Sequence, residues 1–105
     1  MASAVDGAGE GDYGPYRAAF RDRIQELLRY PSSARRRGLS GTVEIEIVVQ
    51  ANGAVSDVAV VDSSSHRVLD EAAVDAARSL PRLPFPDGLR PRALRMRLPV
   101  VFELR

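Results

Sequence analysis

The feature that most constrains the fold is the dipeptide Asn52-Gly53, which separates two alternating apolar runs. Asn-Gly between such runs is the strongest short-range signal for a β-hairpin, because both residues accept the positive φ of a tight turn. We therefore expect residues 41–50 and 55–62 to form adjacent antiparallel strands, with Asn52 and Gly53 as the two turn residues. The pairs that follow from this turn are Ala51 with Ala54, Ile47 with Val58 and Ile45 with Val60.

A third alternating run closes the chain. Every second residue from Leu94 to Leu104 is apolar, which is typical of a half-buried β-strand. Pro99 stands in the middle of this run, and proline has no N–H to donate to a ladder. Since a sheet tolerates proline where the N–H side is unpaired, the last strand is predicted to lie at an edge.

Two amphipathic helices are predicted around these strands. Residues 15–30 carry apolar side chains at helical spacing before Pro31 ends the run, and a short turn that stops at Gly38 follows. Residues 68–80 form the second helix, and the serines at 63–65 offer its caps. A proline-rich connector with Phe85 as its anchor leads to the last strand. The expected buried positions are Tyr16, Phe20, Ile24, Leu27 and Leu28 in the first helix, and Leu69, Ala72, Ala73, Ala76 and Leu80 in the second.

The element order predicts an α+β fold. Two helices pack on one face of a three-stranded antiparallel sheet, in the order helix-strand-strand-helix-strand with sheet order 2-1-3. The helices cover the face that carries Ile45, Ile47, Val58 and Val60. On the open face, Glu44 and Glu46 are expected near Arg95 and Arg97. Residues 15–105 form this domain, and residues 1–14 are either a flexible linker or a lead-in left by expression.

The edge position of the last strand has two interpretations. The backbone groups of Arg97, Pro99, Val101 and Glu103 would point outward, while the residues between them bond to the first strand. In the first interpretation, the proline and the flanking charges protect an open edge against aggregation. In the second, the edge is a docking site to which an extended partner segment adds as a strand. Pairing of two such edges in a homodimer is a third arrangement.

The composition argues against most catalytic and ligand-binding classes. The chain has no cysteine and a single histidine, so disulfides, thiolate metal sites and zinc sites are not expected. Ser63, Ser64, Ser65 and His66 are adjacent, and adjacent residues rarely reach the geometry of a catalytic triad. A net charge of +1 gives no field for nucleic acid. We therefore expect an interaction module that is not an enzyme and holds no metal or cofactor.

Several short motifs occur together along residues 16–105. They are Tyr30-Pro31, Ala34, Gly38-Leu39-Ser40-Gly41, the hairpin ending in serines, Leu69-Asp70 with Ala72-Ala73, Phe85-Pro86-Asp87-Gly88 and the terminal Leu98-Pro99-Val100-Val101-Phe102-Glu103-Leu104. In this combination the chain resembles the C-terminal domain of TonB-type energy transducers. In that family glutamines precede the Tyr-Pro pair, whereas Leu27, Leu28 and Arg29 stand there in this chain.

The resemblance implies a location and partners. It implies a periplasmic domain at the end of a protein anchored in the inner membrane, where a proton-driven motor of the ExbB/ExbD type acts through upstream regions. In the family this domain adds a short segment of an outer-membrane receptor beside its last strand, which energises transport. Related domains serve motility or secretion machines, and this is the alternative function. By position, the partner-binding residues would be Arg95, Arg97, Pro99, Val101 and Glu103, with Arg29 and Tyr30 beside them.

Overall fold

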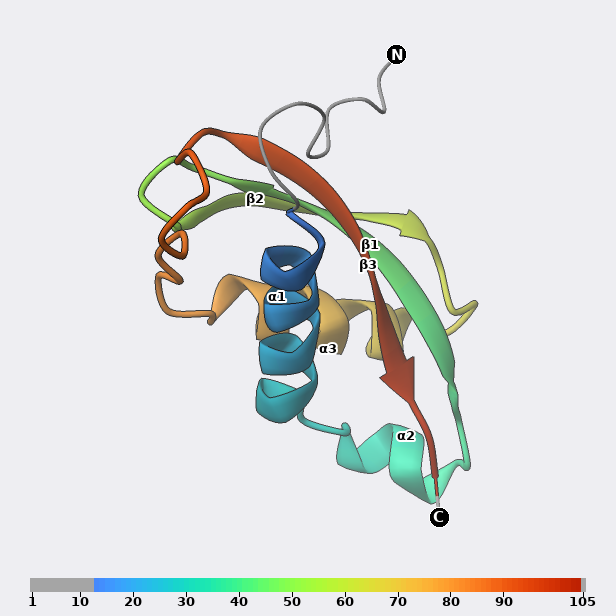
Figure 1. Ribbon diagram of the computed structural model, residues 1–105. Coiled ribbons are helices and arrows are strands. Elements are labelled where there is room, and N and C mark those ends of the chain that lie inside the picture. Colours follow the sequence, from blue (N-terminus) through green and yellow to red (C-terminus); the bar gives the residue numbers. More distant parts are fainter. Residues whose placement is uncertain (1–12, 105) are drawn as a thin grey trace.

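The computed structural model describes residues 13–104 of the 105-residue chain. In chain order the elements are α1 (Gly14–Leu27), α2 (Ser32–Arg36), β1 (Gly41–Val49), β2 (Val55–Asp62), α3 (Arg67–Arg78) and β3 (Leu94–Phe102). The strands form one antiparallel sheet in the order β2-β1-β3, and α1 and α3 lie on one side of it (Figure 1). The predicted fold class and sheet order are confirmed, and the short turn expected after Pro31 is the five-residue helix α2.

Strand alternation divides the sheet into a buried and an open face. The side chains of Val43, Ile45, Ile47 and Val49 in β1 are fully buried, as the alternating pattern predicts. In β3 the even-numbered residues from Leu94 to Phe102 are buried in the same way. The helices complete this core with residues at helical spacing. They are Tyr16, Phe20 and Ile24 from α1, and Leu69, Ala73, Ala76 and Ala77 from α3.

The proline-rich connector before β3 is fastened to α1 by aromatic contacts. The ring of Phe85 stacks on Tyr16 at a centroid distance of 4.4 Å and meets Tyr13 edge-on at 6.1 Å. The Tyr16 hydroxyl donates a hydrogen bond to the carbonyl of Leu83 at 2.5 Å. Burial raises the pKa of Tyr16 to about 12, so this hydroxyl keeps its proton and remains a donor. Phe85 is the anchor of the connector, as expected.

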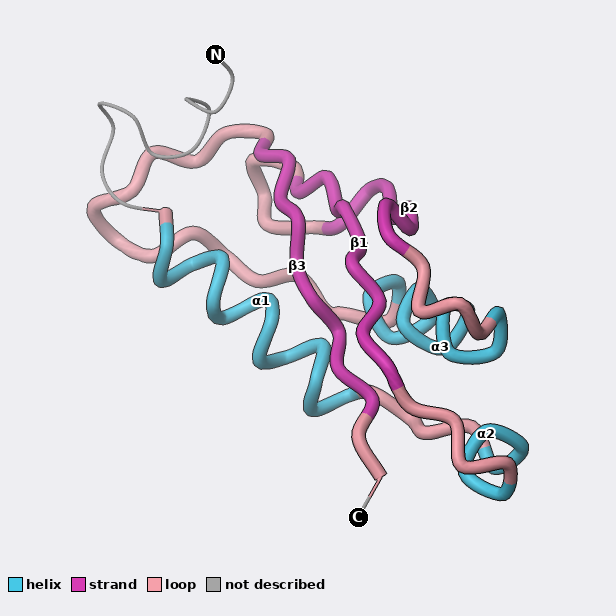
Figure 2. The backbone as a smooth tube through the Cα atoms, turned by 90° about the vertical axis from the view of Figure 1, so that its right-hand side faces the viewer, coloured by secondary structure: helices cyan, strands magenta, loops and turns pink. Residues whose placement is uncertain are grey.

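The two long helices cover different parts of the sheet. Figure 2 shows α1 running beside β3, while α3 lies behind β1 and β2. The connection from β2 through α3 to β3 therefore passes under the sheet and returns at the far edge (Figure 1). Of the predicted lead-in, residues 1–12 lie outside the described residues; Tyr13 is buried and Gly14 begins α1. The placement of α1 decides what surrounds the β3 edge.

The hairpin turn differs from the predicted two-residue turn. Gln50 faces Ala54 across a three-residue loop, with the Gln50 N–H donating to the Ala54 carbonyl at 2.8 Å. Gly53 takes a φ of 86° at the end of this loop, which is the left-handed position of a three-residue hairpin. The predicted opposition of Ala51 and Ala54 is therefore wrong.

A β-bulge restores the predicted pairing further along the hairpin. Val49 pairs with Val55 and Val48 pairs with Asp57, so Ser56 is the extra residue of β2. Beyond this bulge Ile47 pairs with Val58 and Ile45 with Val60. The predicted pairs in the middle of the ladder are confirmed, because the bulge cancels the one-residue difference made by the turn.

Several predicted buried positions are more exposed than expected. Leu27 is 39% exposed because α1 ends there and the chain continues in extended conformation at Leu28. Val60 is 38% exposed because β2 is an edge strand that α3 covers only in part. Ala72 in α3 and Leu80, two residues after α3 ends at Arg78, are half-buried at the rim of the core.

Candidate docking edge

The outer edge of β3 is defined by two contacts to α1. The N–H of Val101 donates to Gln25 Oε1 at 2.7 Å, and Gln25 Nε2 donates to the Val101 carbonyl at 3.2 Å. The carbonyl of Arg97 accepts a hydrogen bond from the Arg17 guanidinium. Within a strand, the backbone groups of alternate residues point to the same side. Arg97, Pro99 and Val101 therefore point away from β1, and the predicted orientation of Pro99 is confirmed.

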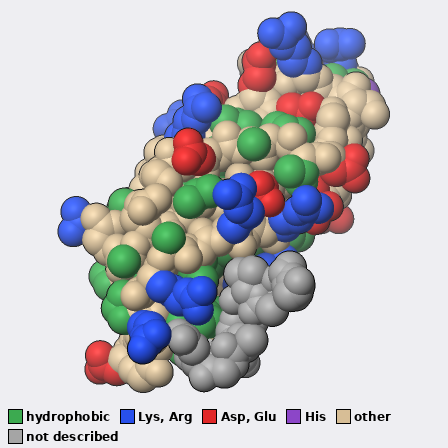
Figure 3. Space-filling view, turned by 90° about the horizontal axis from the view of Figure 1, so that it is seen from above, with side chains coloured by type: hydrophobic (Ala, Val, Ile, Leu, Met, Phe, Trp, Pro, Cys, Tyr) green, Lys and Arg blue, Asp and Glu red, His purple; other side chains and the backbone are tan. Residues whose placement is uncertain are grey.

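The odd-numbered side chains of β3 lie on the open face of the sheet. Glu46 accepts ion pairs from Arg95 at 3.2 Å and from Arg97 at 3.6 Å. The expectation for Glu46 is confirmed. Glu44 lies opposite Pro99, two residues from Arg97 along β3, and forms no ion pair within residues 13–104. Figure 3, seen from above, shows basic and acidic side chains next to one another on this surface. Such exposed pairs each stabilise by only ~0.2–1 kcal/mol.

Arg17 and Gln25 are contacts that the sequence reasoning missed. Each follows a buried residue of α1, Tyr16 or Ile24, so both stand on one flank of the helix. The sequence shows that they share a flank through their spacing of eight residues. It does not show that this flank faces the edge of a strand some 75 residues later, which depends on how α1 packs against the sheet.

Tyr30 and Arg29, the two predicted site residues outside β3, lie in different surroundings. The Tyr30 ring meets Phe102 edge-on at 5.4 Å, its hydroxyl donates to the Leu39 carbonyl, and Arg35 lies over the ring at 5.2 Å. Tyr30 thus supports the end of β3. Arg29 instead lines a groove between α1 and α3, whose other residues are Leu27, Pro31, Ala72, Asp75, Ala76 and Ser79. The structure therefore brings Tyr30, but not Arg29, next to the last strand.

The serine loop before α3 is organised around a carboxylate. Asp70 accepts hydrogen bonds from the hydroxyl groups of Ser63 and Ser64 and from the Ser64 N–H. Partial burial raises the pKa of Asp70, but these hydrogen bonds and the nearby His66 outweigh burial, so the pKa lies below its ordinary value. The serines were predicted to cap α3, but no side chain caps the α3 N-terminus, and Ser63 and Ser64 donate to Asp70 instead. Their hydroxyls are therefore not paired with the His66 ring as a catalytic pair would require.

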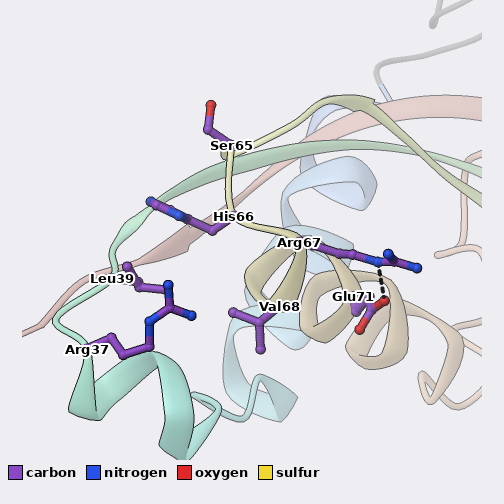
Figure 4. A pocket seen from close by; sticks show the side chains of 7 residues that line it. All are labelled: Arg37, Leu39, Ser65, His66, Arg67, Val68 and Glu71. Carbon is purple, nitrogen blue, oxygen red and sulfur yellow. Dashed lines mark hydrogen bonds and ion pairs between the residues drawn. The ribbon is translucent and has the colours of Figure 1, made fainter.

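A pocket of about 410 Å³ lies beside this loop (Figure 4). Its lining comes from the segment after α2, the serine loop and the first turns of α3, and Arg67 is bound there to Glu71 at 3.0 Å. Across residues 13–104, no group of three metal-ligating side chains is present. Nor does this part of the chain contain a helix long and apolar enough to cross a membrane.

Known proteins resemble this chain both in sequence and in fold. A family model described as the Gram-negative bacterial TonB protein C-terminal matches residues 26–104. The chain belongs to this family. Protein TonB of Xanthomonas campestris pv. campestris is 42% identical to this TonB C-terminal domain over 76 residues, which cover 72% of this chain and 34% of that protein. The domain spans about a third of the length of the curated TonB proteins that it matches.

Solved structures share the architecture. The C-terminal domain of Helicobacter pylori TonB matches with a TM-score of 0.68 at 25% identity, over 87% of this chain and 82% of that chain. TolAIII, solved with a peptide derived from the N-terminus of TolB, matches with a TM-score of 0.67 at 24% identity, over 98% of this chain and 85% of that chain. The second likeness concerns the fold alone.

Proposed function

We propose that this TonB C-terminal domain is a periplasmic docking module. It binds an extended segment of an outer-membrane receptor, which adds as a strand beside β3. The observation that supports this proposal is the outward orientation of the β3 backbone. In the described residues, side chains and not a neighbouring strand bind the Arg97 carbonyl and both the N–H and the carbonyl of Val101. A docked strand can take over these groups without disturbing the ladder to β1.

The side chains around the edge favour a particular kind of segment. Val101 is 40% exposed and lies beside Pro99, so the edge offers an apolar strip on the open face. Arg95 and Arg97 flank this strip, and both remain largely exposed despite their contacts to Glu46. An extended segment with β-branched residues and an acidic residue near these arginines complements this surface.

Strand addition also suits a mechanical role. The domain is the terminal part of a transducer that an inner-membrane motor of the ExbB/ExbD type drives through upstream regions. Each ladder hydrogen bond contributes only ~0.5–1.5 kcal/mol at equilibrium, but a pull along the strand loads several of them at once. A modest resting affinity is thus compatible with force transmission. TolAIII, which shares the fold, has been solved bound to a peptide derived from the N-terminus of TolB.

A second candidate is a non-receptor partner in another envelope machine, such as one for motility or secretion. The sequence before Tyr30-Pro31 points to this candidate, since Leu27, Leu28 and Arg29 stand where the family has glutamines. In the structure Leu27 and Arg29 line the α1–α3 groove rather than the β3 edge. A partner that also contacts this groove would therefore meet leucine and arginine side chains there.

A site-specific crosslink tests both candidates. The chain has no cysteine, so Glu103→Cys places one crosslinker on this domain, just beyond β3, in the full-length protein in intact cells. Asp57→Cys on the opposite edge strand is the matched control. Adducts from position 103 alone, mapped by mass spectrometry to the N-terminal segment of a receptor, are the expected result. Adducts with another envelope protein support the second candidate, and equal or absent adducts at both positions contradict docking at β3.

A further inference from the structure

We propose that Gln25 and Arg17 of α1 occupy the outward backbone groups of the docking edge, and that an incoming strand must displace these two side chains. This inference rests on the proposed docking function, because it concerns the same edge. The inference assigns to these two residues, which lie outside β3, a role in setting the affinity of the domain for an added strand.

Gln25 imitates one residue of a neighbouring strand. In an antiparallel pair, facing residues of a hydrogen-bonded pair exchange two N–H···O bonds. The Gln25 carboxamide makes both of these bonds with Val101, accepting from its N–H at 2.7 Å and donating to its carbonyl at 3.2 Å. A carboxamide has the same donor and acceptor as a peptide group. Gln25 therefore occupies the position that a docked strand would take at Val101.

Arg17 contacts the same edge four residues earlier in β3. Its guanidinium donates to the carbonyl of Arg97. Arg17 and Gln25 are separated by about 12 Å along a helix, and Arg97 and Val101 by about 13 Å along a strand. The two spacings match because α1 runs beside β3, as Figure 2 shows. Between these contacts Pro99 has no N–H, so the Val101 N–H and the Arg97 carbonyl become available to a strand only when Gln25 and Arg17 leave.

Displacement requires only side-chain movement. The buried residues Tyr16, Phe20 and Ile24 fix α1 against the core. Gln25 is exposed, and Arg17 is only partly buried. A strand can therefore enter while the helix stays in place, and it must replace the bonds that these two side chains give up. The same contacts oppose pairing of two β3 edges in a homodimer.

The test uses NMR on the 105-residue chain. The variant is Gln25→Ala, and the matched control is Arg21→Ala. Arg21 stands midway between Arg17 and Gln25, but within residues 13–104 its side chain hydrogen-bonds to Asp22 and not to β3. The first readout is hydrogen exchange of the Val101 amide, compared with the Val100 amide. The second is the affinity for a blocked synthetic peptide of alternating threonine and valine, followed by shifts in β3.

We expect the Val101 amide to exchange at least about tenfold faster in Gln25→Ala while the Val100 amide is unchanged. The peptide should bind about threefold to tenfold more tightly to Gln25→Ala than to the parent or to Arg21→Ala, as the loss of one or two competing hydrogen bonds implies. Gln25→Glu should give an intermediate affinity, because its carboxylate accepts from Val101 but does not donate.

The two proposals fail in different ways. Unchanged exchange at Val101, or equal or weaker peptide binding to Gln25→Ala with shifts still in β3, overturns the role of Gln25 and leaves edge docking intact. A peptide that shifts no β3 resonance in any variant counts against docking at this edge. The Val101 exchange rate then decides by itself whether Gln25 holds the edge.

Discussion

Proline substitution at two neighbouring positions distinguishes the inner and outer sides of β3. Val100 pairs with Val43 of β1 and is fully buried, so its N–H belongs to the internal ladder. Val101 points outward, and its N–H donates to the exposed Gln25 side chain. Val100→Pro and Val101→Pro make the same chemical change one residue apart. They should differ strongly in their effect on stability.

The structure sets the size of the difference. Val100→Pro removes a ladder bond and leaves a buried carbonyl of β1 without its donor, which costs ~1–3 kcal/mol. The altered side chain and ring add further strain, for a total of about 3–5 kcal/mol. Val101→Pro removes one exposed hydrogen bond, which costs ~0.5–1.5 kcal/mol. A domain of this size is stable by about 5–15 kcal/mol, so only the first variant approaches unfolding.

Urea denaturation followed by circular dichroism measures both free energies of unfolding. With the m-values usual for small domains, the two midpoints should differ by about 1–2 M urea. Val101→Pro should keep the native spectrum, yet bind a partner strand more weakly, since a docked strand needs the Val101 N–H. Equal losses of stability in the two variants would refute the assignment of Pro99 and Val101 to the outer side of the edge.

Two further predictions concern the hairpin and the serine loop. Gly53→Ala should lower the melting temperature by several degrees more than Gly88→Ala: both glycines have positive φ, but only at Gly53 would a Cβ lie 2.3 Å from the Leu83 carbonyl oxygen. Similar melting temperatures would contradict this close approach. The pKa of Asp70 is depressed in the folded protein, so its carboxylate stabilises the fold above the unfolded pKa of about 3.9 and ceases to do so as the pH falls through the folded pKa. The difference in unfolding free energy between the parent and Asp70→Asn should therefore shrink on acidification below about pH 4, and a constant difference would contradict the role of the serine hydrogen bonds.

Part of the candidate site follows from local chemistry. Pro99 lacks a donor, and this property alone places it at an edge and sets the outward side of β3. Arg95 and Arg97 follow from alternation with the buried residues of the same strand. By contrast, Arg17 and Gln25 carry no such signal, because polar residues on the flank of an amphipathic helix are ordinary. Their contacts exist only because α1 lies along β3.

The sequence by itself determined the elements and their pairing. Periodicity sorts each strand into a buried and an open face, and Asn52-Gly53 together with Pro99 specifies which strand is central and which is at an edge. The tertiary structure decided the rest. A three-residue turn followed by a bulge at Ser56 gives the middle of the β1–β2 ladder the same pairing register as a two-residue turn without a bulge. The alternation of the strands alone is compatible with both arrangements. Packing of α1 decided that the docking edge is covered by Gln25 and Arg17, since contacts between residues distant in sequence depend on how the helix lies on the sheet.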